Sequence, residues 1–123
     1  MRLFTVEEAN ALLPELRRLL QGVDRERSLL ASLAPEARRA AERASEGGGT
    51  PSGLAYAAAV SNFLERAQEV LGLGIEVKDF DRGLCDFPHL RDGRVVFLCW
   101  EKGEDRVEWW HELEGGFAGR QPL

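Results

Sequence analysis

The sequence predicts an α+β protein in which a long antiparallel helical hairpin precedes a small three- to four-stranded antiparallel sheet and a docked C-terminal tail. Before residue 72, apolar residues recur every three or four positions, which is typical of amphipathic helices. After Gly74 they alternate with polar residues, which is typical of strands. The expected ranges within a single domain of residues 1–123 are 1–46 for a long helix with breaks, 47–53 for a flexible turn, 54–72 for a second helix, 74–112 for the sheet and 113–123 for the tail.

The first helix begins at a recognisable N-terminal cap. Thr5 is the expected N-cap, Glu8 completes a capping box, and Phe4 precedes the cap as a hydrophobic staple. Pro14 lacks a backbone donor and is expected to bend the helix axis, and a second break is expected at Pro35. The apolar positions of this helix are Leu12, Leu16, Leu19, Val23, Leu30 and Leu33.

The second helix is expected to pack antiparallel to the first, because a short turn joins them. The first helix presents more apolar width than one partner helix covers, so we expect a homodimer that forms through the helical hairpin. The expected apolar face of the second helix consists of Leu54, Ala57, Leu64, Ala67 and Leu71, widened by Tyr56, Val60, Phe63 and Val70.

Three segments show the alternation of strands: IEVKDF at 75–80, RVVFLCW at 94–100 and RVEWWHE at 106–112. Gly103 is available for the hairpin loop between the last two segments, and Asp92-Gly93 marks another tight turn. The segment LCDFPHL is expected to return along RVVFLCW at an edge of the sheet, because Pro88 cannot donate a ladder hydrogen bond.

Alternation also assigns the side chains of each strand to two faces. His111 is expected at the rim of the core, where an imidazole is either a structural partner or a site group. The faces expected to look at the helices carry Val95, Phe97 and Cys99 on one strand and Val107 and Trp109 on the next. The three tryptophans, Trp100, Trp109 and Trp110, are expected between sheet and helices rather than in an aromatic cage.

The candidate ligand-binding residues are Asp81, Asp86, His111 and Arg120. An Asp–His pair closed by Arg120 of the tail could bind a small anionic ligand with a carboxylate or phosphate group, or a divalent metal with a third ligand. The structural alternative is that these aspartates cap turns and that arginines pin the loop to the tail. No catalytic residue and no metal ligand is assigned from the sequence alone.

Composition excludes several function classes. The net charge is −5, and residues 54–123 carry eight basic and thirteen acidic side chains, which argues against nucleic-acid binding. No apolar run approaches the roughly 20 residues of a membrane span, and no secretory signal opens the chain, so a cytoplasmic location is expected. Cys85 and Cys99 lack the spacing of a zinc or redox motif and are expected to be reduced, and no cofactor is expected.

The segments FTVEEANALLPEL, EVKDFDRGLCDFPHLRDGRVVFLCW and WHELEGGFAGRQPL resemble a family of small prokaryotic proteins classified as a domain of unknown function. The resemblance covers nearly the whole chain. It implies a bacterial, soluble protein with an ordered tail, and it brings no reaction, cofactor or site residue. Arginine makes up fourteen of the sixteen basic residues, which is typical of a GC-rich genome and is compatible with a thermophilic source.

The predicted function is a non-catalytic module that self-associates or binds a partner through the hairpin. The alternative is a small enzyme, or an anion- or metal-dependent ligand binder, that uses Asp81, Asp86, His111 and Arg120. No nucleophile motif supports acyl transfer. Whether the protein is an enzyme therefore stays open at this point.

Overall fold

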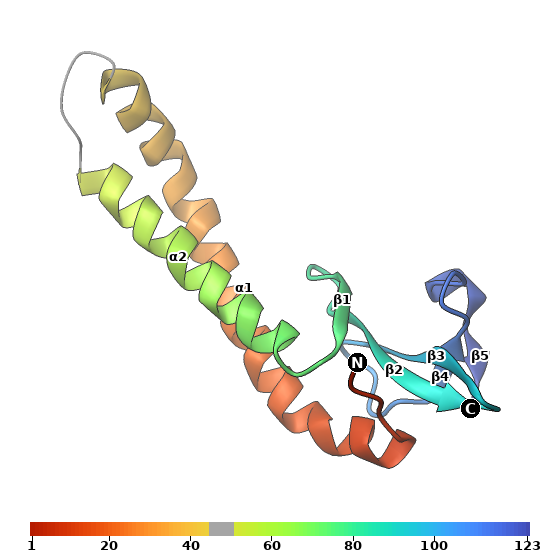
Figure 1. The fold of residues 1–123 in the computed structure, drawn as a ribbon. Coiled ribbons are helices and arrows are strands. Elements are labelled where there is room, and N and C mark those ends of the chain that lie inside the picture. The colour runs from red at the N-terminus through yellow and green to blue at the C-terminus, as the bar shows by residue number, and fades with distance from the viewer. Residues whose placement is uncertain (45–50) are drawn as a thin grey trace. The chain divides into compact units, whose positions relative to one another are not determined.

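A computed structural model describes residues 1–44 and 51–123 (Figure 1). The chain divides into two compact units, Met1–Leu20 with Val70–Leu123 and Gln21–Glu69, and each is described by itself. The elements are α1 (Val6–Ala44), α2 (Pro51–Leu71), β1 (Glu76–Asp79), β2 (Leu84–Arg91), β3 (Arg94–Glu101), β4 (Trp109–His111), a short 3₁₀ helix (Phe117–Gly119) and β5 (Gln121–Pro122). The predicted α+β class is confirmed, with a helical hairpin followed by an antiparallel sheet.

The start of α1 matches its sequence signals. The Thr5 hydroxyl accepts a hydrogen bond from the Glu8 amide at 3.0 Å, and the Glu8 carboxylate accepts one from the Thr5 amide at 2.9 Å. The predicted capping box is therefore confirmed. The predicted break at Pro35 is wrong, because α1 is helical through both Pro14 and Pro35. Each proline removes one helix hydrogen bond, and the good helix formers around it sustain the helix.

The helix α2 begins earlier than predicted. Residues 51–53 belong to it, and Pro51 occupies its first position, where a missing N–H costs no helix bond. The rest of the predicted turn, residues 47–50, lies outside the described residues. None of the helices described is long and apolar enough to cross a membrane.

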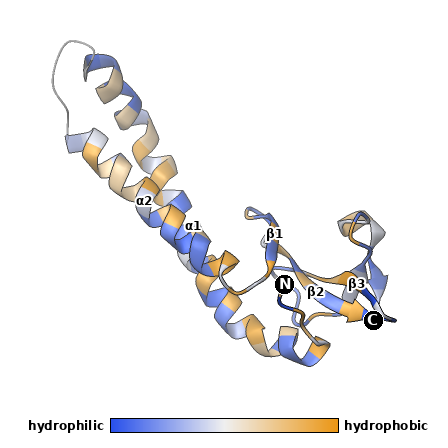
Figure 2. Ribbon diagram, viewed as in Figure 1, coloured by the Kyte–Doolittle hydropathy of each residue, from blue (hydrophilic) through white to orange (hydrophobic). Residues whose placement is uncertain are grey.

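The hairpin unit, residues 21–69, buries few of its large side chains. Its helices run antiparallel, and hydrophobic residues are spread along α2 (Figures 1 and 2). Leu54 and Leu64, predicted for the packed face of α2, are 75% and 52% exposed, whereas Ala67 is buried as predicted. The buried side chains described in this unit are Val23, Ala40, Ala59 and Ala67.

The other unit contains a five-stranded antiparallel sheet with the order β1-β2-β3-β4-β5. The tail supplies β5, which pairs with β4, so the predicted docking of the tail is confirmed and adds a strand to the sheet. Both predicted turns are confirmed: Asp92 and Gly93 have φ of 50° and 78°, and Gly103 has φ of 104°. Positive φ at both central residues is typical of the tight turns that join antiparallel strands.

The predicted edge position of the segment around Pro88 is wrong. The strand β2 lies between β1 and β3 and pairs with β3 along its whole length. Pro88 is tolerated there because β1 pairs only with Leu84, Cys85 and Asp86, which leaves Pro88 beyond the end of β1. The Pro88 carbonyl accepts a hydrogen bond from the Phe4 amide at 2.7 Å.

The prediction that Phe97, Cys99 and Trp109 look at the helices is also wrong. The face that carries Phe87, Leu98 and Trp100 packs on the N-terminal segment and the first turns of α1. The Phe4 and Phe87 rings meet at 5.3 Å, and the Arg17 guanidinium lies 5.6 Å from the centre of the Trp100 ring. Cys99 and His111 therefore lie on the face opposite the one that packs on the first turns of α1, and the sequence could not distinguish two faces that are both apolar.

Candidate functional site

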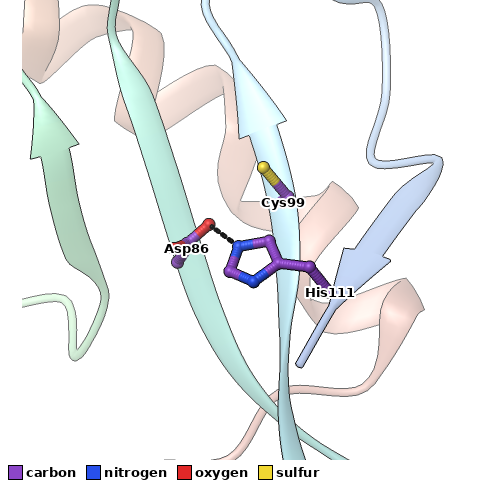
Figure 3. A group of neighbouring side chains, drawn as sticks. All are labelled: Asp86, Cys99 and His111. Atoms are coloured by element: carbon purple, nitrogen blue, oxygen red, sulfur yellow. Dashed lines mark hydrogen bonds and ion pairs between the residues drawn. The ribbon is translucent and has the colours of Figure 1, made fainter. Parts of the chain in front are cut away.

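Asp86 and His111 form a buried hydrogen-bonded pair. Asp86 lies on β2 and His111 on β4, and β3 runs between them. The imidazole Nε2 lies 3.0 Å from Asp86 Oδ1, and each side chain is only 1% exposed (Figure 3). Burial of a carboxylate costs several kcal/mol unless a partner of opposite charge compensates. The structure thus brings together two of the four predicted site residues.

The backbone fixes the tautomer of His111. Its Nδ1 lies 2.6 Å from the carbonyl oxygen of Glu112, and a carbonyl only accepts, so Nδ1 carries a hydrogen. In the neutral ring, Nε2 then presents a lone pair toward the Asp86 carboxylate. Two acceptors at this distance repel each other unless a proton or a cation lies between them.

Asp86 has further unused bonding capacity. Its second oxygen, Oδ2, is buried and has no hydrogen-bond partner among the residues that the structure describes. Buried polar atoms nearly always have a partner, and an unsatisfied one costs roughly 1–3 kcal/mol. This oxygen can still accept a hydrogen bond, and a hydrogen bond between the Cys99 thiol and Asp86 contributes to the raised pKa of that thiol.

Cys99 is the third member of the cluster. It lies directly opposite Asp86 in the pairing of β2 with β3, and it is 1% exposed. Its sulfur, a carboxylate oxygen of Asp86 and an imidazole nitrogen of His111 all lie within 4.8 Å of one another. Burial, reinforced by the charge of Asp86, raises the pKa of the Cys99 thiol to about 12. Without a cation nearby, this thiol stays protonated at neutral pH.

Arg120 lies beside this cluster and is engaged by other groups. Its guanidinium donates to both carboxylate oxygens of Glu104 at 2.7 and 2.9 Å, and to the Cys99 carbonyl at 3.4 Å. It also lies over the rings of Trp109 and Phe117, at 5.1 and 4.6 Å from their centres. Glu104 therefore neutralises the positive charge of Arg120, which was predicted to bind an anionic ligand.

The tail contacts the turn between β1 and β2. The guanidinium of Arg82 lies over the ring of Phe117, 4.5 Å from its centre. Asp81, next to Arg82, is exposed in the turn between β1 and β2 and does not belong to the cluster of Asp86, Cys99 and His111. The structure thus separates Asp81 from the pair that it was expected to join.

Neither Cys99 nor Glu104 was predicted from the sequence to be a site residue. Cys99 was expected to be a reduced thiol, and both cysteines are indeed free and buried. The three clustered residues are 13 and 12 positions apart, which matches no metal or catalytic spacing. Only the register of three paired strands brings them together, with Asp86 opposite Cys99 and Phe97 opposite His111.

Comparison with known proteins places the chain in a family. Residues 2–123 match the uncharacterized conserved proteins called DUF2203. The chain belongs to the DUF2203 family. This confirms the predicted resemblance to a family of unknown function. No curated protein and no solved structure matches the chain.

Proposed function

We propose that this DUF2203 protein is a non-catalytic module that self-associates through its helical hairpin. One observation carries the proposal: Val23 is the only side chain larger than alanine that is buried among the described residues of the 21–69 unit. A pair of helices needs a further layer to cover its apolar surface. A second copy of the hairpin would supply that layer as a four-helix bundle.

The exposed side of α2 supports this proposal. Leu54, Ala57 and Leu64 are exposed and follow the 3–4 spacing of a coiled-coil seam, with Ser61 between them. Small residues at Ala57 and Ser61 would allow a close approach of another helix. A hollow of about 380 Å³ on the hairpin could accept an apolar side chain, and its lining includes Ala34, Ala37, Ala41, Gly53 and Tyr56.

Charge favours a second copy as the partner. Residues 21–69 carry six basic and seven acidic side chains, so this unit is nearly neutral. Residues 1–20 and 70–123 carry ten basic and fourteen acidic side chains. Two hairpins can therefore approach each other without the repulsion that two acidic surfaces would experience.

Two free cysteines also support the expected cytoplasmic location, since reducing compartments keep thiols unpaired.

Sedimentation velocity over a range of concentrations tests self-association. We expect a dimer that dissociates when Leu54 and Leu64 are both replaced by Glu, since both side chains are largely exposed and their replacement spares the fold. Leu113→Glu is the matched control, because Leu113 is 52% exposed in the other unit, and this variant should stay dimeric. A wild-type monomer at every concentration would contradict self-association. Binding of a different protein through Leu54 and Leu64 would instead indicate a heterologous partner.

The second candidate function is ligand binding or catalysis by Asp81, Asp86, His111 and Arg120, and the Asp86–His111 hydrogen bond favours it. Burial weighs against it, because both side chains are 1% exposed and therefore closed to a small molecule in this structure. Thermal-shift measurements with phosphate and simple carboxylates test this candidate. A rise in melting temperature that Arg120→Ala abolishes would support it over the self-association module.

A further inference from the structure

We propose that Asp86, Cys99 and His111 form a binding site for a divalent cation of the zinc type. One carboxylate, one thiol and one imidazole project from three neighbouring strands toward a common point (Figure 3). Their donor atoms lie within 4.8 Å of one another. Tetrahedral zinc, with bonds of about 2.0–2.3 Å, holds its donor atoms about 3.2–3.6 Å apart. Small rotations of the three side chains would therefore close this set around an ion.

The outer hydrogen bonds match those of a metal site. Histidine ligands of metals usually donate their second ring N–H to a carbonyl or carboxylate, which orients the free nitrogen toward the metal. The Nδ1 of His111 donates to the Glu112 carbonyl at 2.6 Å, so Nε2 is the nitrogen left for a cation. A cation there would take the place of the proton that otherwise lies between Nε2 and the Asp86 carboxylate, 3.0 Å apart.

The remaining oxygen of Asp86 gives an independent indication. Its Oδ2 is buried without a hydrogen-bond partner in the described part of the chain, although Asp86 is 1% exposed. A bound cation would satisfy it, since a carboxylate can bind a metal through one or both oxygens. The fourth position of a tetrahedral site is thus available to this oxygen or to a water molecule.

Charge and donor type together select the ion. A divalent cation with one carboxylate, one thiolate and one neutral imidazole has no net charge, which suits a site removed from water. Magnesium and calcium prefer oxygen ligands only, whereas sulfur and nitrogen donors suit zinc and similar transition metals. The thiol would lose its proton to solvent when the cation binds, and the metal–sulfur bond would replace the S–H bond.

A catalytic dyad of Cys99 and His111 fits the geometry less well. Nδ1 donates to the Glu112 carbonyl, and the proton or cation that Nε2 binds lies between it and the Asp86 carboxylate at 3.0 Å, so the thiol has no free base beside it. A nucleophilic cysteine requires a base within hydrogen-bond reach and contact with substrate. The side chain of Cys99 is 1% exposed, and a metal ligand needs no such access once the ion is bound.

Cobalt substitution tests the site on the full-length chain. Protein stripped by a chelator and titrated with Co²⁺ is expected to bind one ion per chain, with a thiolate-to-cobalt charge-transfer band and the visible bands of tetrahedral cobalt. Zinc should displace the cobalt and abolish both signals. The variant Cys99→Ala is expected to lose the charge-transfer band. The matched control is Cys85→Ala, since Cys85 is equally buried on the other face of the sheet, and it should keep the band.

Two results would overturn the proposal: a folded wild-type protein without the charge-transfer band, or a folded Cys99→Ala variant that keeps it. If Cys99→Ala fails to fold, X-ray absorption of zinc-loaded wild type shows whether a sulfur atom binds the metal, without the need for a variant. One sulfur neighbour at about 2.3 Å supports the site, and a shell of only oxygen and nitrogen contradicts it. Because Cys99 and the hairpin leucines lie in different units, sedimentation of the same samples reports on self-association separately.

Discussion

The imidazole of His111 and the carboxylate of Asp86 meet 3.0 Å apart on the sheet face opposite the one that packs on the first turns of α1, and both side chains are 1% exposed. Removal of one member of such a buried pair leaves the other without compensation, which typically costs about 3–5 kcal/mol. The pair is therefore expected to be a principal determinant of stability on this face.

Replacement of Asp86 by Ala should lower the free energy of unfolding by about 3–5 kcal/mol, because His111 would lose its buried partner. Denaturant titration in the presence of a chelator measures this loss without any contribution from a bound metal. Asp105→Ala is the control, since Asp105 is exposed, and it should change stability by less than about 0.5 kcal/mol. Equal effects of the two substitutions would contradict the importance of the pair.

Local signals in the sequence predicted local structure correctly. The capping box of Thr5 and Glu8 formed as predicted, and so did the turn at Asp92-Gly93. Each depends on residues within three positions of one another. A capping box needs the same side chains, and a tight turn the same positive φ, in any fold. Such features can be inferred from a single sequence because no distant part of the chain decides them.

Features that depend on distant pairing were not predictable. The edge prediction for Pro88 failed because the start of β1 at Glu76, twelve residues earlier, decides whether a ladder hydrogen bond is needed at Pro88. The choice of the face that packs on α1 failed because Phe97 and Cys99 on one face are as apolar as Leu98 and Trp100 on the other. The cluster of Cys99 with Asp86 and His111 follows from strand register, which alternation does not specify.

Arg120 should resist conservative replacement. Its guanidinium donates to both oxygens of Glu104 from a single nitrogen, and the planar group lies over the rings of Trp109 and Phe117, a contact that a lysine ammonium, which has no planar face, cannot reproduce. We expect Arg120→Ala to cost about 2–3 kcal/mol of unfolding free energy and Arg120→Lys to lie within about 1 kcal/mol of it.

Thermal and denaturant unfolding measure both variants of Arg120. Arg106→Ala is the control, because Arg106 is exposed, and it should cost less than about 0.5 kcal/mol. Full recovery of stability by Arg120→Lys would show that charge alone holds the tail in place.

Cys85 should make stability fall in alkali. Burial, reinforced by the charge of Asp86, raises the pKa of its thiol from 9.0 to about 12. Between these values the unfolded chain releases the proton while the folded chain keeps it. The stability contribution is therefore complete below pH 9.0 and is lost as the pH rises toward 12. The expected slope from this thiol is about −1.4 kcal/mol per pH unit.

Denaturant titrations of wild type and Cys85→Ala across this range measure the contribution of the thiol. The variant loses some packing at every pH, so the comparison is between slopes rather than absolute stabilities. Its unfolding free energy should fall less steeply with pH than that of wild type. If the two plots of unfolding free energy against pH were parallel, the Cys85 thiol would have the same pKa in the folded and unfolded chains, which would contradict the prediction.

Gly83 should tolerate no side chain. Its φ is +63°, and a Cβ built there would lie 2.5 Å from the Cβ of Lys102. The Lys102 amide donates to the Gly83 carbonyl at 3.0 Å, so the two strands cannot separate to relieve the clash without loss of this bond. Gly83→Ala is expected to cost about 2–4 kcal/mol of unfolding free energy, from the positive φ and the overlap together.

Gly93→Ala is the matched control. The φ of Gly93 is +78°, and a Cβ built there meets no atom within 4 Å among the described residues. Only the backbone cost of about 1–2 kcal/mol therefore applies to this variant. Denaturant unfolding of both variants gives the difference that belongs to the contact with Lys102, and equal losses would show that β2 and β3 adjust freely at this position.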